Sequence, residues 1–104
     1  MIEASIQMPK EQIAEFCRRW LIKEVALFGS VLRADFGPES DLDILVSFSA
    51  EADWGLLDHL KMEKELAVIF NRKIDLFTKR AVEKNHNRLR RQEILRTAEI
   101  VYVT

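Results

Sequence analysis

The sequence contains a single cysteine, no long apolar run and almost no net charge. Cys17 cannot form an internal disulfide bond, and its place in an apolar helical pattern suits a buried thiol in a reducing compartment. No stretch approaches the roughly 20 apolar residues that a membrane span requires, and residues 1–10 lack the apolar run of a signal peptide. We therefore expect a cytoplasmic protein that does not associate with membranes.

The charge balance argues against a nucleic-acid-binding protein. Charged residues make up 32% of the chain, yet the formal net charge is -1. Attraction of the whole molecule to nucleic acid is therefore not indicated. The chain has 104 residues, 48% of them hydrophobic, and shows no internal repeat, linker or low-complexity tract. Residues 1–104 are accordingly expected to form a single domain, too small for separate cofactor and substrate domains.

Apolar spacing predicts how helices and strands alternate along the chain. Helical periodicity predicts amphipathic helices over 9–21 and 55–70, and the basic segment 79–96 is expected to be largely helical. Short apolar runs predict strands at 24–28, 41–48, 73–77 and 100–103. The apolar arc of the second helix is expected to contain Leu56, Leu57, Leu60, Leu66, Ala67 and Phe70. This alternation predicts a two-layer α/β (α+β) domain in which one small mixed sheet packs with helices.

The strand at 41–48 carries two acidic residues on one face. Its period-two pattern places Leu42, Ile44, Val46 and Phe48 on one side, and Asp41, Asp43, Leu45 and Ser47 on the other. Aspartate is depleted in strands. Two carboxylates about 6 Å apart repel by about 2–3 kcal/mol at an effective dielectric constant near 20, and a divalent cation such as Mg²⁺ would turn that repulsion into attraction. The alternative is a solvated strand end with two unrelated acids.

Two further features support a phosphate and metal site. Gly29 and Ser30 end the preceding apolar run, where glycine lets a phosphate approach the backbone and the hydroxyl can bind it; Arg33 could add a charge-assisted bond. Asp75 is the one polar residue inside an apolar strand, and on a neighbouring strand it would face the same metals or accept a proton. A strand-end acid paired with Lys73 or Arg72 is the alternative. Three acids would complete a two-metal site for in-line displacement at phosphorus.

These motifs together resemble those of a known superfamily. The stretch from Leu27 to Val46 contains Gly-Ser, ten intervening residues and Asp-any-Asp. It resembles the signature of the polymerase-β-like nucleotidyltransferases. The short length is similar to that of the minimal nucleotidyltransferases, which include the MntA-like antitoxins paired with HEPN-domain toxins. The resemblance runs from the leading helix through Asp75 to the last strand.

The resemblance implies a role for each motif residue. Gly29, Ser30 and Arg33 would hold the triphosphate of ATP, whereas Asp41, Asp43 and Asp75 would bind two Mg²⁺ ions, with Asp75 also the probable base. Members of this kind act as the antitoxin of a type VII toxin-antitoxin pair: they transfer AMP from ATP to a tyrosine hydroxyl of the HEPN toxin and silence its ribonuclease activity. The implied partners are ATP and that toxin, with either a homo-oligomer or a hetero-oligomer as the assembly.

Several alternatives stay open at this point. The chain could instead neutralise its toxin by binding alone, or modify a small molecule or RNA as larger superfamily members do. The basic segment 79–96 is most simply a solvated face, but it could also dock an acidic partner, contact ATP phosphates or touch RNA. Trp54 could stack on adenine, anchor a partner or only cover an edge of the core.

Overall fold

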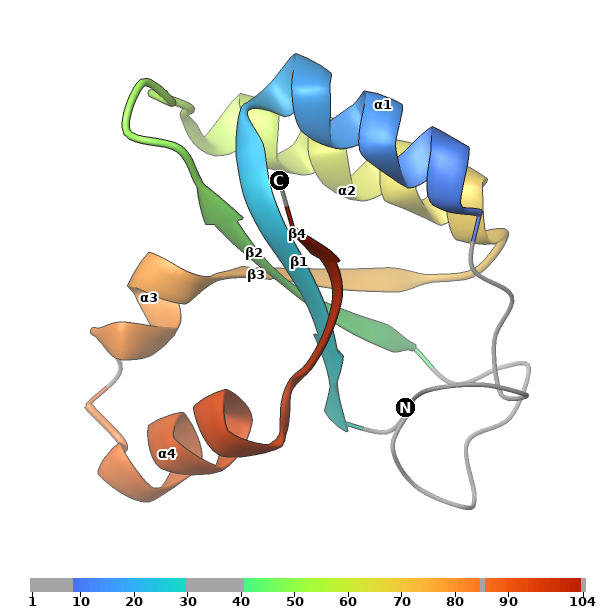
Figure 1. The fold of residues 1–104 in the computed structure, drawn as a ribbon. Coiled ribbons are helices and arrows are strands. Elements are labelled where there is room, and N and C mark those ends of the chain that lie inside the picture. Colours follow the sequence, from blue (N-terminus) through green and yellow to red (C-terminus); the bar gives the residue numbers. More distant parts are fainter. Residues whose placement is uncertain (1–8, 30–40, 85, 104) are drawn as a thin grey trace.

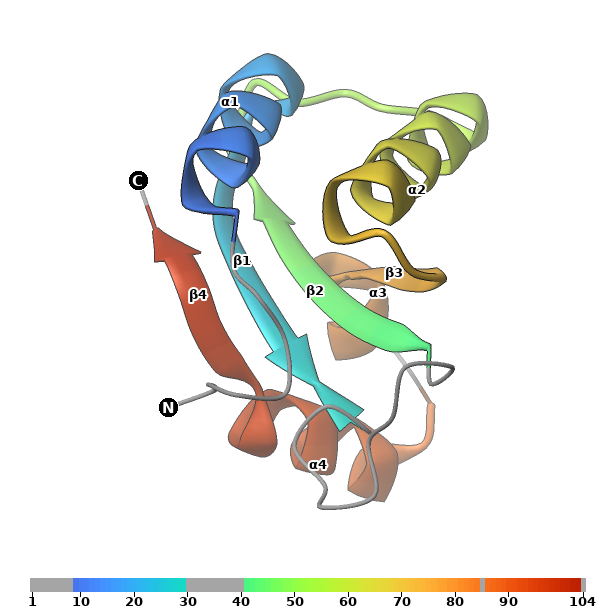
Figure 2. The same ribbon diagram turned by 90° about the vertical axis from the view of Figure 1, so that its right-hand side faces the viewer.

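A four-stranded mixed sheet with helices on both faces forms the framework of the molecule (Figures 1 and 2). The computed structural model describes residues 9–29, 41–84 and 86–103. The elements in chain order are α1 (Lys10–Trp20), β1 (Ile22–Phe28), β2 (Leu42–Phe48), α2 (Leu56–Phe70), β3 (Ile74–Thr78), α3 (Lys79–Glu83), α4 (Arg88–Thr97) and β4 (Glu99–Val103). The predicted mixed α/β fold is confirmed, and each predicted strand is present with ends that differ by one or two residues.

The strand order is β3-β2-β1-β4, so β1 and β2 are the central strands. β1 is antiparallel to both β2 and β4, whereas β2 and β3 are parallel. Parallel neighbours need a crossover connection, and α2 supplies it between β2 and β3. The carboxyl-terminal end of β1 therefore lies beside the amino-terminal ends of β2 and β3. This arrangement brings three separate segments of the sequence to one end of the sheet.

The larger hydrophobic core lies between the sheet and the two helices α1 and α2 (Figure 2). The inward face of β2 contributes Leu42, Ile44 and Val46, all completely buried, as the period-two pattern predicts. The other buried members of this cluster are Ile13, Phe16, Cys17, Ile22, Val25, Leu27, Met62, Leu66, Phe70, Ile74 and Leu76. A smaller cluster on the opposite face, under α3 and α4, consists of Ala26, Phe28, Leu45, Val82 and Ile94.

The apolar arc of α2 is narrower than the sequence suggests. Leu56 and Leu57 are 75% and 74% exposed, and Leu60 is also exposed. The buried positions are instead Met62, Leu66 and Phe70, which follow one another at intervals of four residues. Such a stripe covers one side of a helix only, so the leucines in its first turn point away from the sheet. Of the predicted arc, Leu66 and Phe70 are buried, whereas Leu56, Leu57 and Leu60 lie outside the core.

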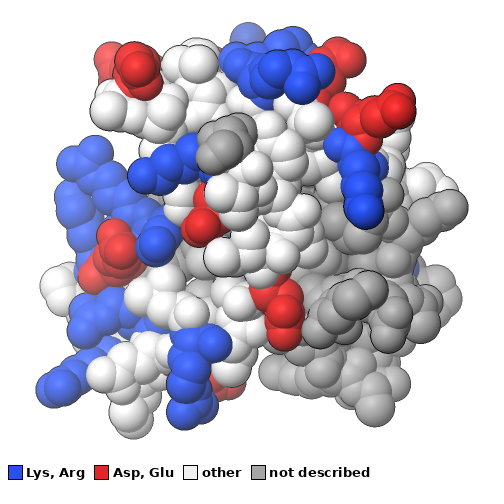
Figure 3. Space-filling view, in the orientation of Figure 1, with Lys and Arg blue, Asp and Glu red and all other residues white. Residues whose placement is uncertain are grey.

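The basic segment 79–96 forms two helices rather than one. α3 follows directly on β3, and Thr78 caps it: the side-chain oxygen accepts a hydrogen bond of 3.1 Å from the amide of Ala81. α4 begins after Asn87, whose side chain accepts a hydrogen bond of 3.1 Å from the amide of Arg90. A residue that caps a helix start cannot continue a preceding helix, because its backbone is extended. Figure 3 shows Lys and Arg side chains gathered at the left of the molecule, over α3 and α4.

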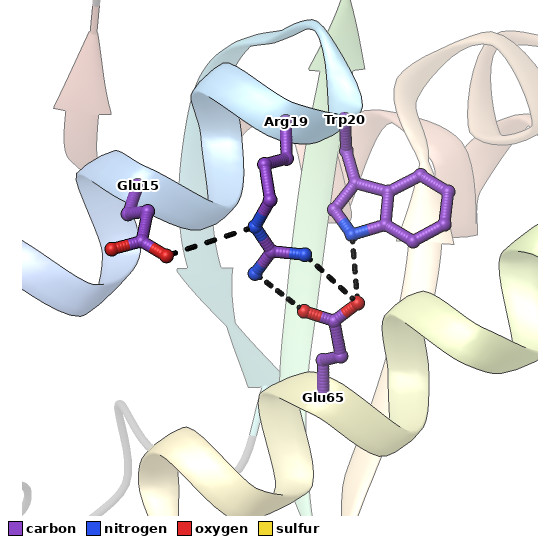
Figure 4. Close-up of polar contacts among 4 residues, drawn as sticks. All are labelled: Glu15, Arg19, Trp20 and Glu65. Carbon is purple, nitrogen blue, oxygen red and sulfur yellow. Dashed lines mark hydrogen bonds and ion pairs between the residues drawn. The ribbon is translucent and has the colours of Figure 1, made fainter.

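A polar cluster joins α1 to α2 on the outer side of the core (Figure 4). Glu65 of α2 accepts hydrogen bonds from the Arg19 guanidinium at 2.7 and 3.3 Å and from Trp20 Nε1 at 3.1 Å. Glu15 lies 3.8 Å from Arg19 Nε on the same helix. The hydrogen bonds from Arg19, assisted by the one from Trp20, hold the pKa of Glu65 below its usual value, although partial burial opposes them. Glu65 therefore fixes the separation of the two helices.

Trp54 covers an edge of this core. Its indole nitrogen donates a hydrogen bond of 2.8 Å to the backbone oxygen of Trp20, and the two rings meet edge to face with centroids 5.0 Å apart. The loop that carries Trp54 follows the carboxyl-terminal end of β2, whereas Asp41 and Asp43 lie at the other end. Of the three readings of Trp54, the structure favours the one in which it covers the core. No helix in the described ranges is long and apolar enough to cross a membrane.

We expect the Glu65 cluster to make stability depend on pH. Because the folded carboxyl has a lower pKa than the unfolded one, near 4.3, the unfolded state binds more protons as the pH falls between these two values, and the free energy of unfolding decreases. Glu65→Gln should flatten this decrease in urea denaturation measured over a pH series. Glu15→Gln, which removes only the longer contact to Arg19, is the matched control and should keep the wild-type slope. Equal slopes for the wild type and Glu65→Gln would contradict this assignment.

Cys17 provides a second test of the core. Burial raises the pKa of its thiol to about 12, so the thiol stays protonated at neutral pH. Since the thiolate is the reactive form, iodoacetamide at about pH 8 should leave the native protein unmodified and alkylate it once urea unfolds it. Mass spectrometry reads the result without ambiguity because the chain has a single cysteine. Rapid alkylation of the native protein would show that the helix α1 opens readily.

Candidate functional site

Asp43 and Asp75 are direct partners on neighbouring parallel strands. The register of β2 and β3 pairs Leu42 with Ile74, Asp43 with Asp75 and Ile44 with Leu76. The apolar residues of these pairs point into the larger core, so the two aspartates point to the opposite face of the sheet. Neighbouring strands lie about 4.8 Å apart, which places the two carboxylates side by side. Both residues are half-buried.

Asp41 lies just before β2 at the same end of the sheet. The amide of Leu42 donates a hydrogen bond of 2.9 Å to the oxygen of Lys73, which holds the start of β2 against β3. Side-chain alternation puts Asp41 on the same face as Asp43. The described residues nevertheless contain no group of three or more His, Cys, Asp or Glu side chains placed to hold a metal ion. The backbone brings the three acids to one end of the sheet, but their side chains do not form such a group. Their joint metal binding stays a prediction.

Gly29 lies directly after β1 and packs closely against Asp43. It follows Phe28, which is the register partner of Asp43 on β1, and it has a φ of +76°. A Cβ built on Gly29 would overlap the Asp43 carboxylate oxygen and lie 3.2 Å from Asp43 Cγ. Only glycine combines this backbone conformation with so close a neighbour at no steric cost. The sequence suggested glycine here for access of a phosphate; the structure adds a second requirement that only the pairing of β1 with β2 reveals.

An apolar surface borders the acids on the same face of the sheet. Leu45 is the next residue after Asp43 on that face of β2, and Phe77 is the next after Asp75 on that face of β3. Phe28 of β1 is the register partner of Asp43. Phe28 and Phe77 meet edge to face with ring centroids 5.1 Å apart. These side chains belong to the smaller core cluster and its margin, beneath α3 and α4. An apolar border lowers the local dielectric constant and so strengthens the interaction of the acids with any bound cation.

Glu63 is a positioning residue that sequence reasoning missed. It lies on α2, and its Oε2 accepts a hydrogen bond of 3.0 Å from the amide of Leu76. β3 is an edge strand, and this bond satisfies one of its outward-facing amides next to Asp75. A helical glutamate has no pattern that distinguishes this role from solvent exposure. Ser30 and Arg33, the other predicted phosphate-binding residues, lie outside the described residues.

The family of the chain follows from comparison with known proteins. Residues 9–101 match the family model described as a nucleotidyltransferase domain, and the chain belongs to that family. The resemblance noted in the sequence is thereby confirmed. The match covers β1, β2 and β3 in full, including the two strands that carry Asp43 and Asp75, and β4 as far as Val101.

One relative in sequence and two solved structures show which proteins the chain is similar to. The chain is 30% identical to the protein adenylyltransferase MntA of Thermococcus cleftensis over 82 residues, which is 79% of this chain and 78% of that protein. A crystal structure of a toxin-antitoxin with AMP-PNP matches 93% of this chain and 75% of that chain, with a TM-score of 0.69 and 19% identity. The structure of a tri-AMPylated Shewanella oneidensis HEPN toxin in complex with MNT antitoxin contains a chain with the same fold. The match covers 90% of this chain and 69% of the chain in that structure, with a TM-score of 0.59 and 19% identity. At these identities the two structures establish the fold.

We expect Gly29→Ala to destabilise the protein by about 1–3 kcal/mol. Alanine is strained in the left-handed backbone conformation of this position, and its Cβ would clash with the Asp43 carboxylate. The free energy of unfolding in urea measures the effect. Gly55→Ala is the matched control: no atom lies within 4 Å of a Cβ at Gly55, and its φ is -98°. Because Gly55 is the N-cap of α2, where alanine is a poorer cap than glycine, this substitution should lower the free energy of unfolding by less than Gly29→Ala does, at most about 1 kcal/mol. Equal effects of the two substitutions would rule out the proposed contact.

Proposed function

We propose that this chain is a Mg²⁺-dependent nucleotidyltransferase that transfers AMP from ATP to a tyrosine hydroxyl of a HEPN-family ribonuclease toxin, and that it acts as the antitoxin of that toxin. The observation that carries the proposal is the pairing of Asp43 with Asp75 beside Gly29, at the sheet end where Asp41 also lies. Membership of the nucleotidyltransferase family supports the reaction class.

The donor chemistry of the site fits magnesium. Asp41, Asp43 and Asp75 offer hard carboxylate oxygens from two adjacent strands on one face of the sheet. When bound, Mg²⁺ supplies positive charge that neutralises the phosphate oxygens and polarises the reacting phosphorus. Gly29, with Ser30 and Arg33 of the following segment, would contact the triphosphate. In this assignment the absence of a side chain at Gly29 allows both the close approach of Asp43 and room for a phosphate.

The transfer itself is a displacement at the α-phosphorus of ATP. The tyrosine oxygen of the acceptor forms a bond to that phosphorus, the bond to the bridging oxygen of the β-phosphate breaks, and pyrophosphate leaves. The phenolic proton goes to the carboxylate of Asp75, which lies on the outer of the two acidic strands. Asp41 and Asp43 would hold Mg²⁺, whose charge would favour an in-line approach to the phosphorus.

The acceptor is proposed from the relatives. The Thermococcus protein is named a protein adenylyltransferase, and the toxin in the Shewanella complex carries AMP groups. The structure with AMP-PNP supports an adenine nucleotide as donor. Together they favour AMP transfer to a toxin over modification of RNA or a small molecule.

A second candidate is an antitoxin that neutralises its toxin by binding alone. The exposed leucines Leu56 and Leu57 in the first turn of α2 favour it, because exposed apolar side chains in adjacent positions suit a partner interface. The two candidates differ in whether the acids are needed for neutralisation.

The experiment combines labelling with protection. Purified protein is incubated with α-labelled ATP, Mg²⁺ and the HEPN toxin, and transfer of label is followed on a gel. The double variant Asp41→Asn, Asp43→Asn should lower transfer by at least about 100-fold, because it removes two carboxylates from the metal. The double variant Glu51→Gln, Asp53→Asn is the matched control: it removes two acids from the loop at the opposite end of β2 and should transfer label at the wild-type rate.

Protection of cells from the toxin separates the two candidates. If transfer is required, the Asp41, Asp43 variant binds the toxin but fails to protect. If it protects fully at normal expression while transferring no label, binding alone is sufficient and the catalytic proposal for neutralisation is wrong. Undiminished labelling by that variant would instead remove these acids from the active site.

A further inference from the structure

Charge is strongly segregated along this chain although the total nearly cancels. Segment 79–96 holds seven basic residues and two acidic ones, whereas the rest of the chain holds nine basic and fifteen acidic residues. The basic residues lie on α3 and α4 and in the short connection between them. Figure 3 shows several groups of Lys and Arg side chains over this part of the molecule, with acidic and uncharged side chains between them. We refer to the exposed side chains of Lys79, Arg80, Lys84, Arg88, Leu89, Arg90 and Arg96 as the basic surface.

The basic surface lies on the same face of the sheet as the acids. Ile94 of α4 packs in the smaller core cluster with Leu45 and Phe28. Leu45 follows Asp43 by one same-face step, about 7 Å along β2, and Phe28 lies opposite Asp43. Helix α4 therefore packs on residues that are direct neighbours of Asp43 in the sheet. A molecule bound along α4 would present its neighbouring groups to Asp43 and Asp75.

Several arginines of this surface have no partner within the described part of the chain. The salt bridges found there involve Arg19, and no ion pair engages Arg88, Arg90 or Arg96. Arg91 differs, since it donates a hydrogen bond of 3.3 Å to the backbone oxygen of Glu83 and ties α4 to α3. Exposed guanidinium groups bind carboxylates in a two-pronged geometry and often dominate protein interfaces.

The composition of the surface distinguishes a protein partner from a nucleic acid. Segment 79–96 contains no Phe, Tyr or Trp, and His86 is its single aromatic ring, so it offers little surface for stacking of bases. It does contain Leu89, which is 78% exposed. Leu89, Gln92, Glu93, Leu95 and Arg96 line a shallow, open depression along α4. An exposed leucine at such a depression suits an apolar side chain of a partner and contributes nothing to phosphate binding.

We propose that the basic surface docks an acidic segment of the acceptor protein, with carboxylates on Arg88, Arg90 and Arg96 and an apolar side chain against Leu89. The docked segment brings the acceptor hydroxyl to the neighbouring acids. The choice of a protein as the partner rests on the proposed function; the binding itself requires no nucleotide and no transfer.

The test is a binding titration with defined probes. A short fluorescein-labelled peptide of alternating glutamate and leucine is compared, by fluorescence anisotropy, with a single-stranded RNA oligonucleotide of equal net charge. The peptide should bind the wild type more tightly than the RNA does, and its affinity should fall as salt is added. The triple variant Arg88→Glu, Arg90→Glu, Arg96→Glu should weaken peptide binding by about tenfold or more. Leu89→Ser should weaken binding of the peptide by about fivefold and leave RNA binding unchanged.

A matched variant controls for net charge. Arg18→Glu, Lys61→Glu, Lys64→Glu reverses three exposed charges on α1 and α2 and should leave peptide affinity within about twofold of the wild type. Equal weakening by both triple variants would overturn the proposal, since only total charge would then matter. Tighter binding of RNA than of the peptide would assign the surface to nucleic acid. A loss of ATP affinity in the Arg88, Arg90, Arg96 variant, with peptide binding intact, would assign these arginines to the nucleotide.

These outcomes are separable from the fate of the proposed function. Peptide binding without AMP transfer would leave the docking surface in place and reject the enzyme activity. AMP transfer to the toxin with no effect of the Arg88, Arg90, Arg96 variant on either peptide or toxin binding would leave the activity in place and reject the docking surface.

Discussion

The alternation of side chains between the two faces of β2 is the constraint on which the site depends. Leu42, Ile44 and Val46 are completely buried between the sheet and α1 and α2, so the residues between them must face the other way. A shift of one residue in pairing would move the acids into the core and the apolar residues out of it. Desolvating an unpaired carboxylate costs several kcal/mol, which makes that shift prohibitive for a small domain. Hydrophobic packing on one face thus fixes where Asp43 stands on the other.

Local periodicity was enough to predict the elements, because the features that define them lie within a few residues of each other. The strand at 41–48, its two faces and the odd position of Asp75 could all be predicted in this way. Pairing could not, since it joins distant segments: the contact between Gly29 and Asp43 exists only because Phe28 pairs with Asp43. Leu57 and Met62 show the same limit in a helix. The predicted arc included Leu57 and omitted Met62, and only the position of α2 on the sheet decides that Met62 is buried and Leu57 is exposed.

The two faces of the sheet carry unequal shares of the core. Among the described residues, the cluster beneath α1 and α2 has fourteen buried members, whereas the one beneath α3 and α4 has five. Most of the hydrophobic stabilisation that these residues supply therefore comes from the face away from the acids. The Glu65 cluster and the Trp20–Trp54 contact reinforce that same face. Because stability rests there, the acidic face can carry repelling carboxylates and a lightly packed pair of helices without unfolding the domain.

The separation of charge between segment 79–96 and the remaining residues gives the molecule a permanent electric dipole despite its small net charge. In the field of a charged protein, such a dipole experiences a torque before any contact is made. An anionic partner would therefore tend to meet this molecule with α3 and α4 already turned toward it, and a cationic partner would meet the opposite side. The orientational search, which normally slows association far below the collision rate, becomes shorter as a result. A protein with almost no net charge can in this way still favour one orientation of a charged partner during association.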